Sequence, residues 1–177
     1  MHEDIEKILI GEDEIKARVA EAGAKISRDF AGKDPIFVGV LKGCFIFMAD
    51  LMRYVDIQCS MDFMAVSSYS GTSSTGAVKI NKDLSEDIEG RHLIIVEDIL
   101  DSGVTLSYLK NYLMVRKTAS ISIVTLMDKP ARRKADVYAD YSCFEVPDAF
   151  VVGYGLDYNE RYRNLPYIGV LKPEIYS

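Results

Sequence analysis

The sequence predicts an α/β fold in which a mostly parallel central sheet is flanked by helices. Short apolar runs rich in β-branched residues alternate with segments whose apolar residues recur every three or four positions, as in strand–helix–strand units. The runs are apolar at consecutive positions, as expected of strands that are covered on both faces. From residue 129 onward the composition shifts toward Tyr, Pro and Asn, which predicts a small lobe of short strands.

The first half of the chain shows this alternation clearly. Apolar residues from Ile15 to Phe30 share one face of a helix predicted over 12–30. The apolar run IFVGVL, residues 36–41, predicts the first buried strand. The remaining predictions for this half are a helix over 45–55 and strands over 61–69 and 77–83.

The second half continues with a strand, a helix carrying leucines at helical spacing, and another strand, over residues 91–98, 104–117 and 120–128. No internal repeat and no second apolar core is evident. We therefore predict a single domain over residues 1–177. Its core spans roughly 10–130, and a small hood lobe is formed mainly by the C-terminal segment, roughly 131–177, plus the N-terminal residues.

Composition and charge exclude several classes of function. The chain has 27 Asp and Glu against 21 Lys and Arg, and a net charge of −6 is not expected of a protein that binds nucleic acid or anionic membranes broadly. No apolar stretch approaches the roughly 20 residues of a membrane span, and the N-terminus lacks a secretory signal. Cys44, Cys59 and Cys143 show no CxxC spacing, so we expect small apolar fillers in a reducing cytosol. His2 and His92 are expected at the surface.

The stretch LIIVEDILDSGVTL, residues 93–106, places acidic and small hydroxylated residues directly after a buried strand. In an open parallel sheet, ligands bind beyond the carboxyl ends of the strands, where Glu97 and Asp98 fall. Gly103 lets the backbone approach a ligand closely, and the amides that begin the following helix favour an anion. The motif predicts a sugar-phosphate site whose carboxylates bind ribose hydroxyls or Mg²⁺. An acidic turn with Ser102 as a helix cap is the alternative.

A stretch of Ser, Thr and Gly around a single Tyr, SSYSGTSSTG, separates two of the predicted strands. It has little surface to bury, so it is expected to be mobile. A plain hairpin loop and a lid that closes over a substrate both satisfy this composition.

Several segments, in order and at matching spacing, resemble one family. IIVEDILDSGVTL resembles the phosphoribosyl-pyrophosphate motif of type I phosphoribosyltransferases. VLKGCFIFMADL, VSSYSGTSSTG, DKPARR and PDAFVVGYGLDYNERYRNLPYIGVL are similar to segments of the 6-oxopurine members, the hypoxanthine-guanine phosphoribosyltransferases. The resemblance implies the type I phosphoribosyltransferase fold. It also implies a purine salvage reaction that joins hypoxanthine or guanine to phosphoribosyl pyrophosphate, releases pyrophosphate, and uses Mg²⁺.

Within the motif, the resemblance implies that Glu97 and Asp98 hold the ribose hydroxyls and the Mg²⁺. The loop around the 5′-phosphate would be formed by Asp101, Ser102, Gly103, Val104 and Thr105. Asp101 would also face the base and accept a proton from a purine ring nitrogen. Some relatives carry Lys or Arg in place of Val104, whose backbone amide can still donate.

The resemblance assigns the pyrophosphate to Lys42, Gly43 and Arg163, and family members have a cis peptide bond just before that lysine. Guanidinium suits bidentate phosphate binding. Considered alone, Lys42 is better explained as a solvated loop lysine. The neighbouring arginines are expected at the surface: Arg132, Arg133 and Arg161.

On the base, the resemblance implies that Lys129 donates to the exocyclic oxygen and that Phe150 stacks on the purine. The backbone of Val151 would meet the ring edge. Asp157 resembles a position in this part of the site that is associated with a second Mg²⁺ near the pyrophosphate. Considered alone, Phe150 is better explained by core packing. The lid residues would be Ser68 and Tyr69.

Two other functions fit the sequence less well. A nucleotide-binding regulator of this fold would need an added DNA- or RNA-binding surface, which the acidic chain does not offer. A phosphoribosyltransferase for a 6-amino purine or a pyrimidine would not need a lysine donor at position 129. The ranking of hypoxanthine, guanine and xanthine stays open, because the resemblance implies that the tail reads the 2-position largely through backbone groups. Family members assemble as dimers or tetramers, so a homodimer or homotetramer is expected.

Overall fold

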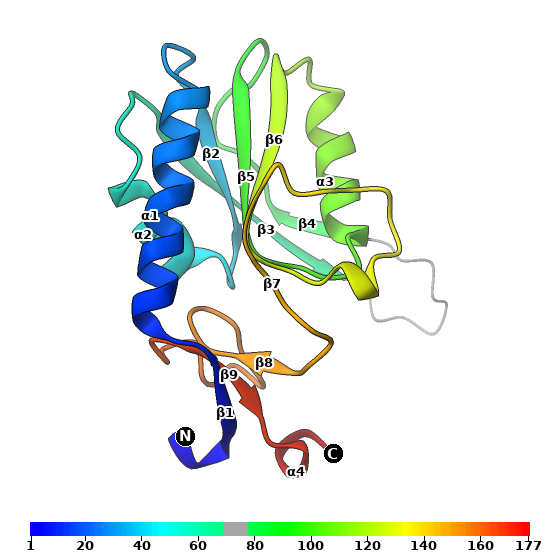
Figure 1. Cartoon of the computed structure of the whole chain (residues 1–177). Coiled ribbons are helices and arrows are strands. Elements are labelled where there is room, and N and C mark those ends of the chain that lie inside the picture. The colour runs from blue at the N-terminus through cyan, green and yellow to red at the C-terminus, as the bar shows by residue number, and fades with distance from the viewer. Residues whose placement is uncertain (69–77) are drawn as a thin grey trace.

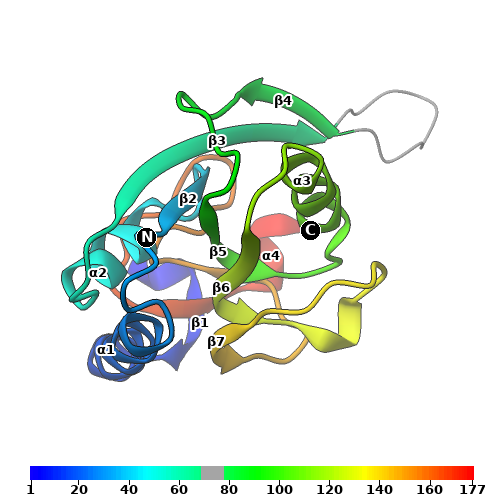
Figure 2. The same ribbon diagram turned by 90° about the horizontal axis from the view of Figure 1, so that it is seen from above.

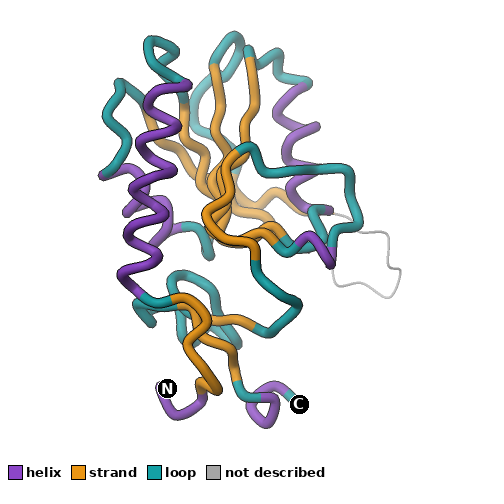
Figure 3. The backbone as a smooth tube through the Cα atoms, in the orientation of Figure 1, coloured by secondary structure: helices purple, strands orange, loops and turns teal. Residues whose placement is uncertain are grey.

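The computed structural model describes residues 1–68 and 78–177 and contains two β-sheets (Figure 1). The larger sheet carries helices on both faces and forms the upper part in Figure 1, whereas the smaller sheet lies below it, at the end where both termini are found. The chain passes between the two parts at residue 11 and again over residues 146–150 (Figure 3).

The main sheet contains β2 (Ile36–Leu41), β3 (Ser60–Ser68), β4 (Val78–Lys82), β5 (His92–Leu100), β6 (Ser120–Asp128) and β7 (Tyr141–Glu145). Its strand order is β4-β3-β2-β5-β6-β7. All neighbouring strands are parallel except β4, which runs antiparallel to β3 at one edge. The predicted α/β fold with a mostly parallel sheet is confirmed.

Helices cover both faces of this sheet (Figure 2). α1 (Glu12–Asp29) and α2 (Phe45–Arg53) lie on one face, and α3 (Val104–Met114) lies on the other. Successive β2 side chains divide between them, since Phe37 packs with the α1 and α2 cluster and Val38 packs with the leucines of α3. This explains why β2 is apolar at consecutive positions. None of the described helices is long and apolar enough to cross a bilayer.

The smaller sheet has the order β1-β9-β8 and is antiparallel, built from β1 (Ile5–Ile10), β9 (Ile168–Leu171) and β8 (Val151–Val152). A separate apolar cluster includes residues of this sheet, and its members Val152, Leu165 and Leu171 are at most 1% exposed. A short helix, α4 (Pro173–Tyr176), ends the chain, and 3-10 turns occupy His2–Asp4 and Pro130–Arg132. We call this sheet together with residues 147–177 the hood.

Three sequence-based expectations need correction. Residues 131–146 were assigned to the hood, but β7 is the edge strand of the main sheet and pairs in parallel with β6. β5 extends to Leu100, two residues beyond the end of the strand predicted over 91–98. His92 is half-buried, and its Nδ1 lies 2.7 Å from Ser120 Oγ on the adjacent strand.

Candidate active site at the carboxyl edge of the main sheet

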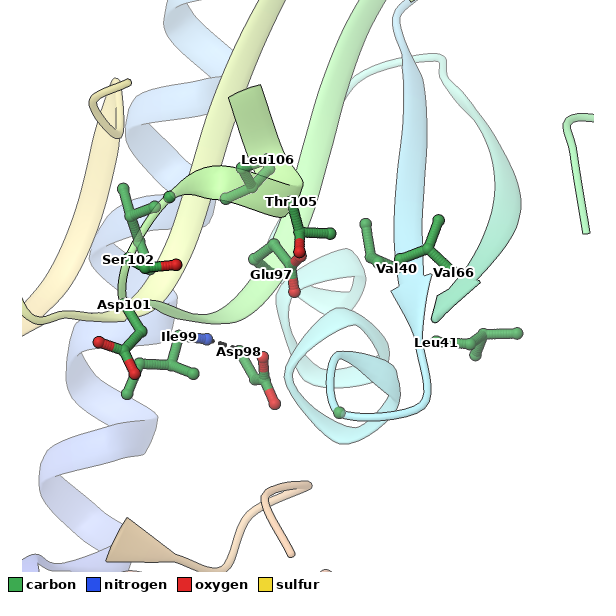
Figure 4. A pocket seen from close by; sticks show the side chains of 13 residues that line it. Val40, Leu41, Val66, Glu97, Asp98, Ile99, Asp101, Ser102, Thr105 and Leu106 are labelled. Atoms are coloured by element: carbon green, nitrogen blue, oxygen red, sulfur yellow. Dashed lines mark hydrogen bonds between the residues drawn. The ribbon is translucent and has the colours of Figure 1, made fainter. Parts of the chain in front are cut away.

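Glu97 and Asp98 lie near the end of β5 and line a cavity of about 260 Å³ (Figure 4). β2 pairs with β5 only as far as Gly39 and Val96, so the two strands part immediately before the carboxylates. α2 follows β2 on one face of the sheet and α3 follows β5 on the other. Where the connections after two adjacent strands leave on opposite faces of the sheet, a crevice forms, and open α/β sheets bind their ligands there.

The two adjacent carboxylates are difficult to ionise together. Burial, reinforced by the neighbouring Asp98 charge, raises the pKa of Glu97 well above its usual value of 4.5. Burial also raises the pKa of Asp98, although its Oδ1 accepts a hydrogen bond of 2.8 Å from the Ile99 amide, which opposes the rise. The pair therefore favours a ligand that brings hydroxyl donors or a cation.

A loop of small residues connects β5 to α3 and completes the same cavity, which is lined by Asp101, Ser102, Gly103 and Thr105. Gly103 has a φ of +77°, and a Cβ there would lie 2.5 Å from Val137 Cγ1, so the position requires glycine. Val104 is the first residue of α3, and its side chain does not line the cavity. The first-turn amides of α3 have no partner within the helix and favour an anion beside the loop.

Arg133 holds this loop in place through hydrogen bonds to backbone carbonyl groups. It is therefore not the solvated surface residue that was expected. Its Nε donates to the Asp101 carbonyl at 3.1 Å, and its Nη1 donates to the Val137 carbonyl at 2.6 Å. Its Nη2 also forms an ion pair with Asp128, and only 13% of the Arg133 side chain is exposed. The backbone of the loop is thus fixed by a guanidinium that is mostly shielded from solvent.

Arg132 is half-exposed, but it also points into the site rather than away from it. Its Nε lies 3.2 Å from Asp101 Oδ1, and its Nη1 lies 3.3 Å from Asp148 Oδ1. Arg161 is exposed, as expected.

Lys42 and Gly43 follow β2 on the opposite side of the cavity, and the Leu41–Lys42 peptide bond is cis, as the family resemblance implies. A Cβ on Gly43 would lie 1.8 Å from Asp98 Oδ2, so a side chain here would displace the carboxylate. The hood approaches from the other direction, since a Cβ on Gly155 would lie 2.2 Å from the Gly43 carbonyl oxygen. The loop is therefore held between β5 and the hood.

Lys42 and Arg163 come together through an acidic residue that sequence reasoning missed. Glu160 Oε2 lies 2.8 Å from Lys42 Nζ, and its Oε1 lies 3.2 Å from Arg163 Nη2. Arg163 also contacts Asp157 Oδ1 at 3.0 Å and donates to the Gly155 carbonyl at 2.8 Å. Two cations thus converge beside the Gly43 loop, each paired with a carboxylate of the hood.

Lys129, Phe150 and Val151 form a third group, where the main sheet meets the hood. Lys129 is only 5% exposed, and its Nζ donates to the Ala149 carbonyl at 2.8 Å. Phe150 is 39% exposed, so it is not a core residue, and Tyr176 stacks on its ring at a centroid distance of 4.6 Å. Val151 is buried in β8. A fixed amine beside an exposed aromatic ring can bind a flat ligand with an acceptor oxygen.

Comparison with known proteins agrees with this geometry. The model of the phosphoribosyl transferase domain family matches residues 10–159. The chain is 59% identical over 178 residues to the hypoxanthine-guanine phosphoribosyltransferase of Bacillus subtilis (strain 168), covering 100% of this chain and 99% of that protein. The chain belongs to the hypoxanthine-guanine phosphoribosyltransferase family.

Further relatives support the same family. The hypoxanthine-guanine phosphoribosyltransferase of Streptococcus pneumoniae (strain ATCC BAA-255 / R6) is 52% identical, with coverage of 100% of this chain and 99% of the relative. A crystal structure of a hypoxanthine phosphoribosyltransferase from Staphylococcus aureus matches with a TM-score of 0.97 and 53% identity, covering 100% of this chain and 97% of that one.

The remaining predicted residues of this phosphoribosyltransferase lie at the margins of the site. Ser68 is the last residue of β3, and Tyr69 lies outside the described residues, as does the rest of the predicted loop up to residue 76. Cys44 follows Gly43, and burial together with the nearby carboxylates raises the pKa of its thiol to about 12. All three cysteines are free, and two of them are buried, in agreement with small apolar fillers.

The residues that sequence reasoning missed in this phosphoribosyltransferase have a common character. Glu160, Arg132 and Arg133 lie in charged, polar stretches that are typical of solvated loops. Their partners lie far away in the chain or on another strand, as in the contact between Glu160 and Lys42. No periodic pattern marks such a contact. The only local signal was the density of charge in DKPARR and NERYR.

Proposed function

We propose that this protein transfers the phosphoribosyl group of phosphoribosyl pyrophosphate to hypoxanthine and guanine, forming IMP or GMP and pyrophosphate in purine salvage. The observation that carries this is the arrangement of three ligand sites around one carboxyl edge. A carboxylate pair beside an anion-binding loop suits a ribose 5-phosphate. Paired cations beside Gly43 suit a pyrophosphate, and a buried amine next to Phe150 suits a 6-oxopurine.

The reaction builds negative charge on the departing pyrophosphate while the sugar becomes oxocarbenium-like. We assign stabilisation of the leaving group to Lys42, Arg163 and the Gly43 loop. Glu97 and Asp98 hold the ribose hydroxyls, and the loop 101–105 binds the 5′-phosphate. A site that binds both ends of the substrate positions the anomeric carbon for attack by the base.

Recognition of the base falls to the hood side. Lys129 donates to the 6-oxo oxygen, Phe150 stacks on the purine, and the backbone of Val151 meets the ring edge. Asp101 accepts the proton that leaves a purine ring nitrogen as the new bond forms. An ammonium has three donors and no acceptor, so the site disfavours a 6-amino group.

The carboxylates at the end of β5 fit Mg²⁺. Glu97 and Asp98 offer only oxygen ligands, which Mg²⁺ prefers, and burial of two adjacent carboxylates favours a bound cation. When bound, the ion would neutralise charge on the pyrophosphate. Among residues 1–68 and 78–177 no group of three or more His, Cys, Asp or Glu is arranged to hold a metal, so other ligands would come from substrate and water. Asp157, now paired with Arg163, is assigned to a second ion.

Three further assignments rest on the family resemblance. Ser68 and Tyr69 belong to a lid that excludes water from the reacting centre. The protein acts in the cytosol, which the free cysteines support. It assembles as a homodimer or homotetramer, which size-exclusion chromatography with light scattering would measure.

A steady-state assay tests the proposed function directly. Hypoxanthine, guanine, xanthine and adenine are each supplied with phosphoribosyl pyrophosphate, with and without Mg²⁺, and pyrophosphate release is measured. We expect turnover of hypoxanthine that requires Mg²⁺ and very poor use of adenine. Absence of turnover with every 6-oxopurine at saturating Mg²⁺ would exclude the enzyme assignment. Efficient use of adenine would exclude the 6-oxopurine assignment alone.

A further inference from the structure

Arg132 bridges two carboxylates that come from different parts of the site. Its Nε lies 3.2 Å from Oδ1 of Asp101, in the loop after β5. Its Nη1 lies 3.3 Å from Oδ1 of Asp148, which precedes β8 in the hood. Asp148 is in turn 3.9 Å from Lys129 Nζ. Asp101, Arg132, Asp148 and Lys129 thus form a continuous series of ion pairs.

The backbone that carries Arg132 is fixed. The residue ends the 3-10 turn Pro130–Arg132, and its amide donates to the Lys129 carbonyl at 3.1 Å. The Lys129 amide donates to the Leu100 carbonyl at 2.9 Å, which ties this turn to the end of β5. The next residue, Arg133, is anchored to the Asp101 carbonyl. These hydrogen bonds fix the backbone position from which the Arg132 side chain reaches Asp101.

Asp101 has an unusual environment for a loop carboxylate. Its Oδ1 is buried and has no hydrogen-bond partner among the described residues, although 41% of the side chain as a whole is exposed. Among the described residues, the Arg132 guanidinium is the one cation within ion-pair distance of this carboxylate. The contact with Arg132 is therefore the one ion pair that the described residues offer to orient the Asp101 side chain.

We propose that Arg132 is a positioning residue that aims the Asp101 carboxylate at the base and ties it to the base-binding turn through Asp148. The inference rests on the proposed function, in which Asp101 accepts the proton and Lys129 reads the 6-oxo group. Guanidinium suits this role because its planar fork can contact two carboxylates at once. The half-exposed pairs contribute little to folding stability, so the role of Arg132 lies in geometry.

The test combines two Arg132 variants with a double-mutant cycle. Arg132→Gln removes the charge, Arg132→Lys keeps it, and Arg28→Gln is a matched control on the exposed side of α1. We expect Arg132→Gln to lower kcat for hypoxanthine about tenfold, because misplacing a catalytic group by about 1 Å costs up to about 100-fold. Arg132→Lys should stay within about threefold of wild type, and Arg28→Gln should be unchanged. The KM for phosphoribosyl pyrophosphate should change by less than about twofold in all of them.

The cycle asks whether Arg132 acts through Asp101. In an Asp101→Asn background, adding Arg132→Gln should change kcat by less than about twofold, since the carboxylate it positions is gone. Melting temperatures of the Arg132 variants should stay within about 3 °C of wild type.

Several outcomes would overturn the proposal. These are an unchanged or increased kcat in Arg132→Gln, equal losses in the Gln and Lys variants, or a full tenfold loss in the Asp101→Asn background. Each of them leaves the proposed function standing if the wild type turns over hypoxanthine in the same assay. Absence of wild-type turnover would overturn both.

Discussion

The two sides of the active site are built in different ways. The sugar-phosphate side comes from one continuous segment, residues 97–105, which runs from the end of β5 through a tight loop into α3. The base and pyrophosphate side is assembled from Lys42 and Gly43, the turn after β6, and the hood. The first is held by a buried sheet, and the second by contacts between distant parts of the chain.

This difference indicates how each side meets its ligand. On the sugar-phosphate side the acids are partly buried at the end of β5, and Arg133 fixes the loop backbone. On the other side, the cations are occupied by hood carboxylates. The pair between Lys42 and Glu160 is 67% and 63% exposed, and pairs of this kind contribute at most about 1 kcal/mol. A pyrophosphate can replace such weak contacts, so we expect the hood side to rearrange on binding while the β5 side stays in place.

Asp101→Asn should give the largest effect, because it removes the proton acceptor and preserves the shape of the sugar-phosphate side. We expect kcat to fall by roughly 10²–10⁴-fold. The KM for phosphoribosyl pyrophosphate should change far less. Steady-state kinetics with both substrates measures this, with Asp13→Asn on the exposed side of α1 as the control. A kcat within a fewfold of wild type would make Asp101 a structural turn residue.

Gly43→Ala tests the point where the two sides touch. The added Cβ would lie 1.8 Å from Asp98 Oδ2, so the carboxylate or the loop must move. We expect kcat/KM for phosphoribosyl pyrophosphate to fall on the order of 100-fold, as for a catalytic group displaced by about 1 Å. Gly11→Ala is the matched control, since its Cβ would meet nothing within 4 Å. Equal activity of the two variants would show that the loop does not depend on this contact.

Lys129→Ala should weaken binding of the purine base and leave binding of phosphoribosyl pyrophosphate unaffected. Loss of a charged hydrogen bond costs about 1.5–3 kcal/mol, which corresponds to a rise on the order of 10–100-fold in KM for hypoxanthine and guanine. The KM for phosphoribosyl pyrophosphate should hardly change, and Lys16→Ala on the exposed surface of α1 serves as the control. Equal losses for base and sugar phosphate would indicate that Lys129 supports the fold or binds phosphate.

Glu97→Gln should stabilise the free protein. The folded-state pKa of Glu97 is raised above 4.5, so the folded protein binds more protons than the unfolded chain, and stability falls as pH rises from 4.5 through the raised pKa. A neutral glutamine does not ionise, so the variant does not lose folding stability as the pH rises. A change of 1 kcal/mol moves the melting temperature of a chain of this size by roughly 2–4 °C, and we expect a gain of that order at pH 7.

Melting curves between pH 5 and pH 8 measure this effect, with Glu86→Gln as an exposed control. The gain should shrink as the pH falls through the raised pKa of Glu97, because the folded wild type then takes up the proton. The same variant should bind phosphoribosyl pyrophosphate more weakly, because a ligand for the ribose or Mg²⁺ is lost. A melting temperature below that of wild type at pH 7 would show that the charged Glu97 is better solvated than its burial indicates.

The sequence by itself determined the local elements and the continuous side of the site. IFVGVL is apolar at consecutive positions because both faces of β2 are covered. Glu97, Asp98 and Asp101 could be recognised because a strand, an acid pair and a glycine loop follow one another along the chain. Their chemistry depends on neighbours in sequence, which a pattern records.

Only the tertiary structure decided which distant residues meet. It placed β7 in the main sheet, brought Glu160 between Lys42 and Arg163, and turned Arg132 and Arg133 toward the loop that contains Asp101. A charged residue in a loop has the same local pattern whether it is solvated or paired. The difference comes from partners brought close by the packing of the hood and strands, and no local periodicity encodes that.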